Sequence, residues 1–116
     1  MTYRLLTQGE VEEQILRLSD ELEAETDRYA RLADKAATAE ADYKLQAARL
    51  MVGFVASPSK MTALEKQARV DAQCDGSYRV WKINEAQRQA SKEALLSLRA
   101  RLDSLRTLSA NIRNQT

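Results

Sequence analysis

Apolar side chains recur every three or four residues along most of this chain, which is the period of one face of an α-helix. If Val11 takes heptad position d and Ile15 position a, the apolar residues keep to these two positions as far as Tyr43, with Glu25 as the exception. This register predicts a coiled-coil seam, the stripe of a and d residues that packs against another helix. The seam residues are Val11, Ile15, Leu18, Leu22, Tyr29, Leu32, Ala36, Ala39 and Tyr43.

The last third of the chain carries a second stripe, which is rich in leucine. With Leu98 as d and Leu102 as a, its seam residues are Leu95, Leu98, Leu102, Leu105 and Ile112. We also expect Leu108 to be buried beside them. Before the leucines, the pattern predicts a narrower apolar face made of Tyr78, Trp81, Ala86, Ala90 and Ala94.

Two capping boxes and one proline mark helix ends. Thr7 with Glu10, and Thr62 with Glu65, have the Thr-x-x-Glu spacing in which a side-chain oxygen accepts from a free backbone N–H. Pro58 ends the first helix, because the residue before a proline is pushed out of the α region.

The predicted helices cover about residues 8–53, 62–74 and 77–113, with a loop over about 54–61 and a break or kink near Gly76. The predicted fold is all-α, a single coiled-coil domain over residues 1–116. It is a long antiparallel helical hairpin with a short middle helix. Because two helices leave each other half exposed, we expect several chains to self-associate as a homo-oligomer.

The composition argues against an enzyme. The 116 residues include no His and one Cys, so the usual proton shuttle and most zinc ligands are missing, and we expect no metal and no cofactor. A lone Cys74 cannot form an intrachain disulfide, which is typical of a reducing cytoplasm. The longest apolar run, residues 50–56, is far below the roughly 20 residues of a membrane span, and residues 1–6 have no extended apolar core like that of a secretory signal. We expect a cytoplasmic protein that does not enter membranes.

The charge is distributed unevenly although the net charge is only +1. Residues 1–43 carry five basic and eleven acidic side chains, a balance of −6, whereas residues 77–116 carry eight basic and three acidic ones, a balance of +5. Such polarity indicates a charged partner, or attraction between the two halves.

Four cations share heptad position e of the last helix and form what we call the basic ridge: Lys92, Arg99, Arg106 and Arg113. Further cations lie nearby at Arg79, Lys82, Arg88 and Arg101. A line of cations could follow a nucleic-acid backbone and contact phosphates without sequence readout. The alternative is that these charges are solvated or pair across the seam, where Glu12, Glu21, Glu40 and Asp42 occupy e or g positions.

Two further features bear on the same question. Tyr78 and Trp81, interleaved with basic residues, are candidates for stacking with exposed bases, although a pair at this spacing also packs well as a hydrophobic anchor. An acidic stripe occupies the outermost position f of the first helix and therefore cannot neutralise the ridge within one hairpin. Its members are Glu13, Asp20, Asp27 and Asp34.

The chain also resembles a group of small tailed-phage proteins labelled UvsY-like recombination mediators. The resemblance spans roughly residues 30–113 and is carried by EADYKL at 40–45, TALEKQA at 62–68, KINEAQ at 82–87, LR at 98–99 and LRTL at 105–108. It implies an all-helical oligomer in the host cytoplasm that binds single-stranded DNA and helps a recombinase displace the single-strand-binding protein. The matched basic positions that would contact DNA are Lys82, Arg88, Lys92, Arg99 and Arg106.

The leading hypothesis is therefore a phage-type DNA-binding accessory protein that grips single-stranded or duplex DNA through its basic C-terminal helix. A coiled-coil assembly or scaffolding protein without nucleic-acid binding is the main alternative. A third hypothesis is a module that docks one helix into a groove of another protein.

Overall fold

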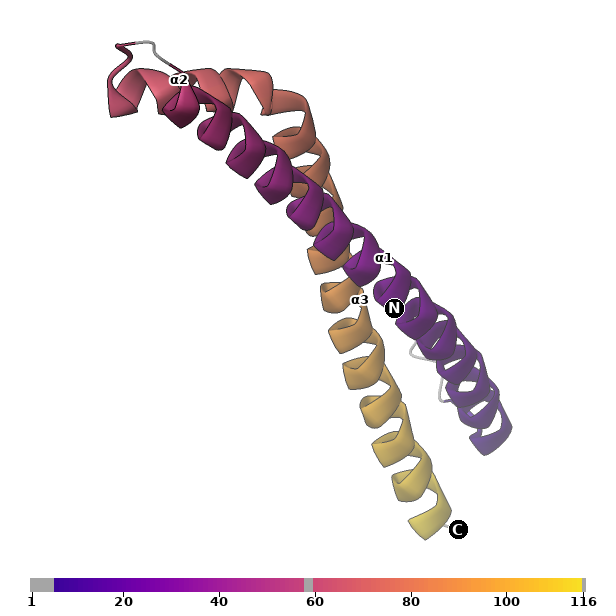
Figure 1. Cartoon of the computed structure of the whole chain (residues 1–116). Coiled ribbons are helices and arrows are strands. Elements are labelled where there is room, and N and C mark those ends of the chain that lie inside the picture. Colours follow the sequence, from indigo (N-terminus) through magenta and orange to yellow (C-terminus); the bar gives the residue numbers. More distant parts are fainter. Residues whose placement is uncertain (1–5, 58–59, 116) are drawn as a thin grey trace. The chain divides into compact units, whose positions relative to one another are not determined.

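The structure is a computed structural model that describes residues 6–57 and 60–115. It has three helices, α1 (Gln8–Ala56), α2 (Ala63–Gln73) and α3 (Asp75–Asn114), and no strand occurs among the described residues (Figure 1). The prediction of an all-α chain with two long helices and a short middle one is confirmed.

Both predicted capping residues lie at helix starts. The backbone N–H of Glu10 donates to Thr7 Oγ1 over 3.2 Å, and that of Glu65 donates to Thr62 Oγ1 over 3.1 Å. Each threonine thus satisfies one N–H that has no partner within its helix.

The first helix ends later than its sequence suggests. α1 continues through Gly53 to Ala56, and the Ser57 N–H still donates to the Gly53 carbonyl over 3.1 Å. One glycine costs a helix only about 1 kcal/mol, which is too little to end a long one. The helix-ending role given to Pro58 falls outside the described residues.

The break between α2 and α3 lies at Cys74, and the expected break at Gly76 is wrong because α3 runs through that glycine. The Cys74 N–H donates to the Val70 carbonyl, and the Tyr78 N–H to the Cys74 carbonyl, each over 2.9 Å, so helical hydrogen bonds continue on both sides of the break. The side chains of Val70 and Cys74 are each 1% exposed. Burial of these two apolar side chains stabilises the position of the break.

The contacts group into two compact units. The terminal unit comprises residues 1–30 and 90–116, and the middle unit comprises residues 31–89. This grouping leaves the prediction of a single domain open.

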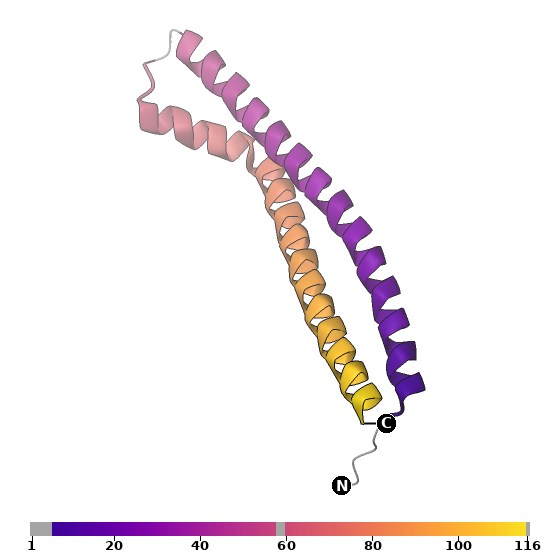
Figure 2. The ribbon, with the colours of Figure 1, turned by 90° about the horizontal axis from the view of Figure 1, so that it is seen from below.

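In the terminal unit, α1 and α3 pack side by side in antiparallel directions (Figure 2). The core is formed by Val11, Leu18, Leu95 and Leu102, which are buried. The other seam residues predicted here are half-buried, namely Ile15, Leu22, Tyr29, Leu98, Leu105 and Ile112. Leu108 is 36% exposed, so its expected burial is wrong: it lies at heptad position g, beside the seam.

Two polar layers cross the terminal core. The buried Ser91 hydroxyl donates to Glu25 Oε1 over 2.7 Å, which explains why a glutamate occupies a seam position of α1. The Gln8 side-chain amide donates to the hydroxyl of buried Ser109 over 2.9 Å. Since a polar pair at a and d positions is satisfied in only one alignment, these layers favour the observed register.

The middle unit has a different core. Leu32, Ala36 and Ala39 of α1 are buried, and α1 and α3 are again antiparallel, with the Ser77 hydroxyl donating to Gln46 Oε1 over 2.7 Å. The expected apolar face of α3 is wrong at Tyr78, Ala86 and Ala90, which are exposed. The heptad register of the leucines instead continues towards the start of α3, where the polar residues Ser77, Asn84 and Arg88 share its inward positions with Trp81.

Candidate nucleic-acid interface

The basic ridge lies on α3 in the terminal unit. Its four side chains are exposed and follow one another at seven-residue steps. At 1.5 Å per residue each step is about 10.5 Å along the helix. The ridge is thus a regular row of positive charge on one side of a single helix.

Three of the ridge cations, Lys92, Arg99 and Arg106, are weakly neutralised. Arg106 Nη1 lies 3.8 Å from Asp103 Oδ1 on the same exposed surface. Lys92 and Arg99 have no ion-pair partner among the residues that the structure describes. Since exposed pairs contribute only about 0–1 kcal/mol, even Arg106 remains able to exchange its carboxylate for a phosphate.

Three of the other candidate cations, Arg79, Lys82 and Arg88, lie in the middle unit and have local partners. Arg79 Nε is 3.0 Å from Asp75 Oδ2, and Lys82 Nζ lies 4.1 Å from the centre of the Trp81 ring. Arg88, expected to face outward, occupies a seam position with its side chain 25% exposed, and it forms an ion pair with Glu85. Arg88 is thus the least able of these cations to contact a backbone, whereas the exposed Arg79–Asp75 pair, like the pair of Arg106, can exchange its carboxylate for a phosphate.

The Arg88–Glu85 pair changes the protonation behaviour of the carboxylate. Hydrogen bonds from Arg88, one of them 3.2 Å from Nε to Oε2, hold the pKa of Glu85 below its ordinary value. Partial burial opposes this shift, whereas the positive charges of Arg88 and Lys82 add to it. The guanidinium of Arg88 therefore interacts mainly with the Glu85 carboxylate.

The aromatic candidates pack into a cluster with Tyr43. Trp81 stacks on Tyr43 with ring centres 5.4 Å apart and an interplanar angle of 26°, and Tyr78 meets both rings edge-on at 5.5 and 5.8 Å. Trp81 is half-buried, and Tyr78 is 42% exposed. The contacts favour the packing interpretation of Tyr78 and Trp81, since their rings are already engaged within the unit.

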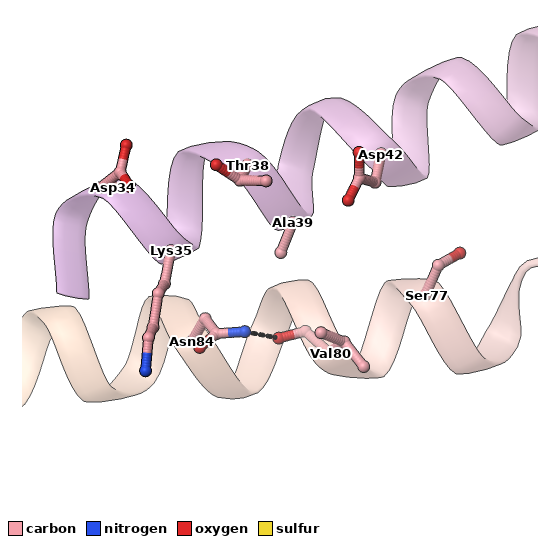
Figure 3. Close-up of a pocket in the computed structure, with 8 residues that line it drawn as sticks. All are labelled: Asp34, Lys35, Thr38, Ala39, Asp42, Ser77, Val80 and Asn84. Atoms are coloured by element: carbon pink, nitrogen blue, oxygen red, sulfur yellow. Dashed lines mark hydrogen bonds between the residues drawn. The ribbon is translucent and has the colours of Figure 1, made fainter. Parts of the chain in front are cut away.

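The middle unit contains a groove between α1 and α3, which we call the acidic groove (Figure 3). Its volume is about 450 Å³, and the Asp34 and Asp42 carboxylates of α1 outnumber the one cation, Lys35. Ala39 and Val80 provide apolar surface. The Asn84 side-chain amide donates a hydrogen bond to the Val80 carbonyl over 2.8 Å. This charge balance disfavours a phosphate.

The terminal unit contains a second groove of about 350 Å³, which we call the basic groove. Its lining residues come from both long helices and are Gln14, Arg17, Leu18, Ala100, Arg101, Ser104 and Leu105. Arg101 was predicted only as a neighbour of the ridge, and Arg17 was not among the predicted binding residues. The available signal was the heptad register: positions c and g of two antiparallel helices border the same side of the seam, and these arginines occupy c and g.

The acidic stripe on α1 lies on the opposite side of that helix from its seam. Glu13, Asp20 and Asp27 in the terminal unit are exposed, as is Asp34 in the middle unit. These carboxylates repeat at the same seven-residue step as the ridge cations. The chain therefore presents two charged rows of equal period and opposite sign.

No family model, curated protein or solved structure matches this chain. Across the described residues, no group of three or more His, Cys, Asp or Glu side chains is placed to hold a metal ion. No described helix combines the length and the apolar character required to cross a membrane.

Proposed function

We propose that this chain is a helical accessory protein that holds single-stranded or duplex DNA through the basic ridge of α3, without bond-making chemistry. The observation that supports this function best is the exposure of the four ridge cations together with the lack of ion-pair partners for Lys92 and Arg99 among the described residues. The resemblance to UvsY-like recombination mediators adds a recombinase or a single-strand-binding protein as further partners.

The spacing of the ridge suits a backbone of phosphates. Along the axis of a duplex, one step of about 10.5 Å spans about three base pairs, because each strand carries one charge per 3.4 Å of the axis. Contacts with phosphates position a protein on DNA without reading its sequence, so binding is non-specific.

We also propose that the protein acts as an oligomer. Half-buried seam residues such as Leu22 and Leu98, and exposed apolar residues such as Leu16 and Leu96, leave the terminal unit with apolar surface that a second copy would cover. Light scattering at two protein concentrations tests this part. A monomeric mass at both concentrations would refute self-association.

A second candidate function is assembly without DNA. The acidic stripe supports it, because the ridge of one chain has the same period as the stripe of another and the opposite charge. In that case the cations set helix pairing between subunits, and the protein is a scaffold.

Fluorescence anisotropy of labelled single-stranded and duplex DNA separates the two functions. Replacing Arg99 and Arg106 with Glu should weaken DNA binding strongly, because four units of charge change on the ridge. The matched control replaces Arg49 and Arg69, exposed arginines of the middle unit, and changes the net charge equally.

Equal losses in the two variants would show that net charge alone drives binding and would overturn the role of the ridge. If the Arg99 and Arg106 variant instead loses its oligomeric state by light scattering while the control keeps it, these arginines lie between subunits. That result would favour the assembly function.

A further inference from the structure

We propose that the basic groove is a second binding site, which takes one phosphate-bearing nucleotide of a nucleic-acid strand. The proposal deepens the DNA-binding function above and rests on it. Whereas the ridge belongs to α3 alone, the basic groove has one wall from α1 and one from α3. A strand held there would therefore contact both long helices.

Two guanidinium groups from different helices border this groove. Arg17 and Arg101 are exposed, and neither has an ion-pair partner among the described residues. The lining residues of this groove include no Asp or Glu, although Arg17 and Gln14 also line a neighbouring groove with Glu10 and Glu13. Since a guanidinium can donate two parallel hydrogen bonds to a phosphate, the groove favours a phosphate between the two arginines.

The floor of the groove suits the remainder of a nucleotide. Leu18 is buried, Leu105 is half-buried, and Ala100 adds a third apolar side chain. Gln14 and Ser104 provide hydrogen-bonding groups beside this apolar surface. An inorganic phosphate would leave the floor uncovered, whereas the sugar and base of a nucleotide would cover it.

The dimensions agree with such a ligand. A volume of about 350 Å³ is near the lower end of the range of about 300–1,000 Å³ that small-molecule sites occupy. Ala100 and Ser104 have small side chains, which leave space for a ligand on the α3 side of the groove. The acidic groove has a similar volume but carries Asp34 and Asp42, so it serves as an internal comparison that a nucleotide should avoid.

Titration of the ¹⁵N-labelled full chain by NMR tests the site directly, using thymidine monophosphate as the probe. The side-chain N–H signals of Arg17, Arg101 and Gln14 should shift and saturate, while those of Arg49 and Arg69 stay in place. Thymidine and inorganic phosphate, titrated separately, should each bind at least about tenfold more weakly, because each lacks one half of the recognised chemistry. Equal shifts at all the arginines, or no saturation, would overturn the proposal.

Single substitutions then assign the contacts. Arg17→Gln and Arg101→Gln should each lower the affinity for thymidine monophosphate by about tenfold, as expected for the loss of hydrogen bonds to a charged group. Arg99→Gln, which alters the ridge, should leave this affinity unchanged. A loss caused equally by Arg99→Gln would show that the ridge, and not the groove, holds the nucleotide.

The same measurements separate failure of the groove from failure of the proposed function. If DNA binds through the ridge while thymidine monophosphate leaves Arg17 and Arg101 unshifted, the groove proposal is wrong and the function stands. If the nucleotide binds in the groove while neither form of DNA binds the protein, the groove is a nucleotide site and the DNA-holding function is wrong.

Discussion

The terminal and middle units use one heptad pattern but present opposite chemistry in their grooves. The basic groove of the terminal unit is lined by Arg17 and Arg101, and the acidic groove of the middle unit by Asp34, Asp42 and Lys35. The seam decides how the helices pair, whereas the residues beside it, at positions c, f and g, decide what a groove can bind. Nucleic-acid contact is therefore expected in the terminal unit.

The cations of the two units also differ in whether they have partners within their own unit. In the middle unit Arg79 and Arg88 are paired with carboxylates of their own helix, and Lys82 lies over Trp81. In the terminal unit Lys92 and Arg99 have no ion-pair partner among the described residues. Counting basic residues along α3 therefore overstates the surface that can meet a phosphate.

The cores differ as well. The terminal unit buries Leu95 and Leu102 of α3, whereas the middle unit adds a cluster of three aromatic rings and buries no described residue of α3; its buried residues are Leu32, Ala36, Ala39, Val70 and Cys74. Replacing Leu102 with Ala should give the largest loss of stability, about 2–5 kcal/mol, because it leaves a cavity in a core with few large side chains. Urea unfolding followed by circular dichroism measures it.

Leu108→Ala is the matched control for that substitution, since it removes the same atoms from a partly exposed position outside the seam. It should cost much less than Leu102→Ala. Similar losses in the two variants would mean that the leucines of the terminal unit are not divided into core and rim as described.

The polar layer of the terminal unit gives the next largest effect. Ser91→Ala removes the hydroxyl that donates to Glu25, and hydrogen bonds to charged groups contribute about 1.5–3 kcal/mol. Adding Glu25→Leu should recover stability by restoring an apolar seam. If Ser91→Ala unfolds at the same urea concentration as the parent, the Glu25 carboxylate finds another donor and the layer has no structural role.

At the junction between α2 and α3, Gly76→Ala should stabilise the middle unit by up to about 1 kcal/mol, because alanine is the better helix former. No described heavy atom outside the local helix backbone lies within 4 Å of the added Cβ. A higher melting temperature is the expected result. A lower one would show that the chain needs the freedom of glycine beside the Cys74 break.

The smallest expected effect concerns pH. Because the folded-state pKa of Glu85 is lowered, the Glu85–Arg88 pair stabilises the fold above the unfolded pKa of glutamate, and this contribution is lost as the pH falls through the lower folded pKa. In Arg88→Ala the carboxyl should titrate at a higher pH than in the parent. Carbon-detected NMR of Glu85 follows both titrations, and coincident curves would rule out Arg88 as the cause.

Much of the fold could be predicted from the sequence because helix geometry is local. Thr62 begins a helix through a bond to a residue three positions later, and every a and d residue from Val11 to Tyr43 is buried or half-buried. The polar seam of α3 could not be found in this way. Asn84, Arg88 and Ser91 are polar, so a search for apolar residues does not find them. They occupy a and d positions when the register of the leucines is extended towards the start of α3.

The candidate site was only partly predictable for a similar reason. The ridge repeats within one helix, so its period is visible in the sequence. The basic groove combines Arg17 with Arg101, and their proximity follows only from the antiparallel pairing of α1 with α3. A charge balance by region also does not show the local partners of Arg79 and Arg88, although the spacings of Asp75 and Glu85 on the same helix indicate them.

The most direct test is the salt dependence of binding to single-stranded DNA by the unmodified protein, followed by fluorescence anisotropy. If the four ridge cations displace counterions, the logarithm of the affinity should fall linearly with the logarithm of salt concentration, with a slope of about −3. Occupation of the basic groove by one further phosphate of the same strand would steepen the slope to about −3.5. No binding at about 50 mM salt, or an affinity that does not change with salt, would contradict the account.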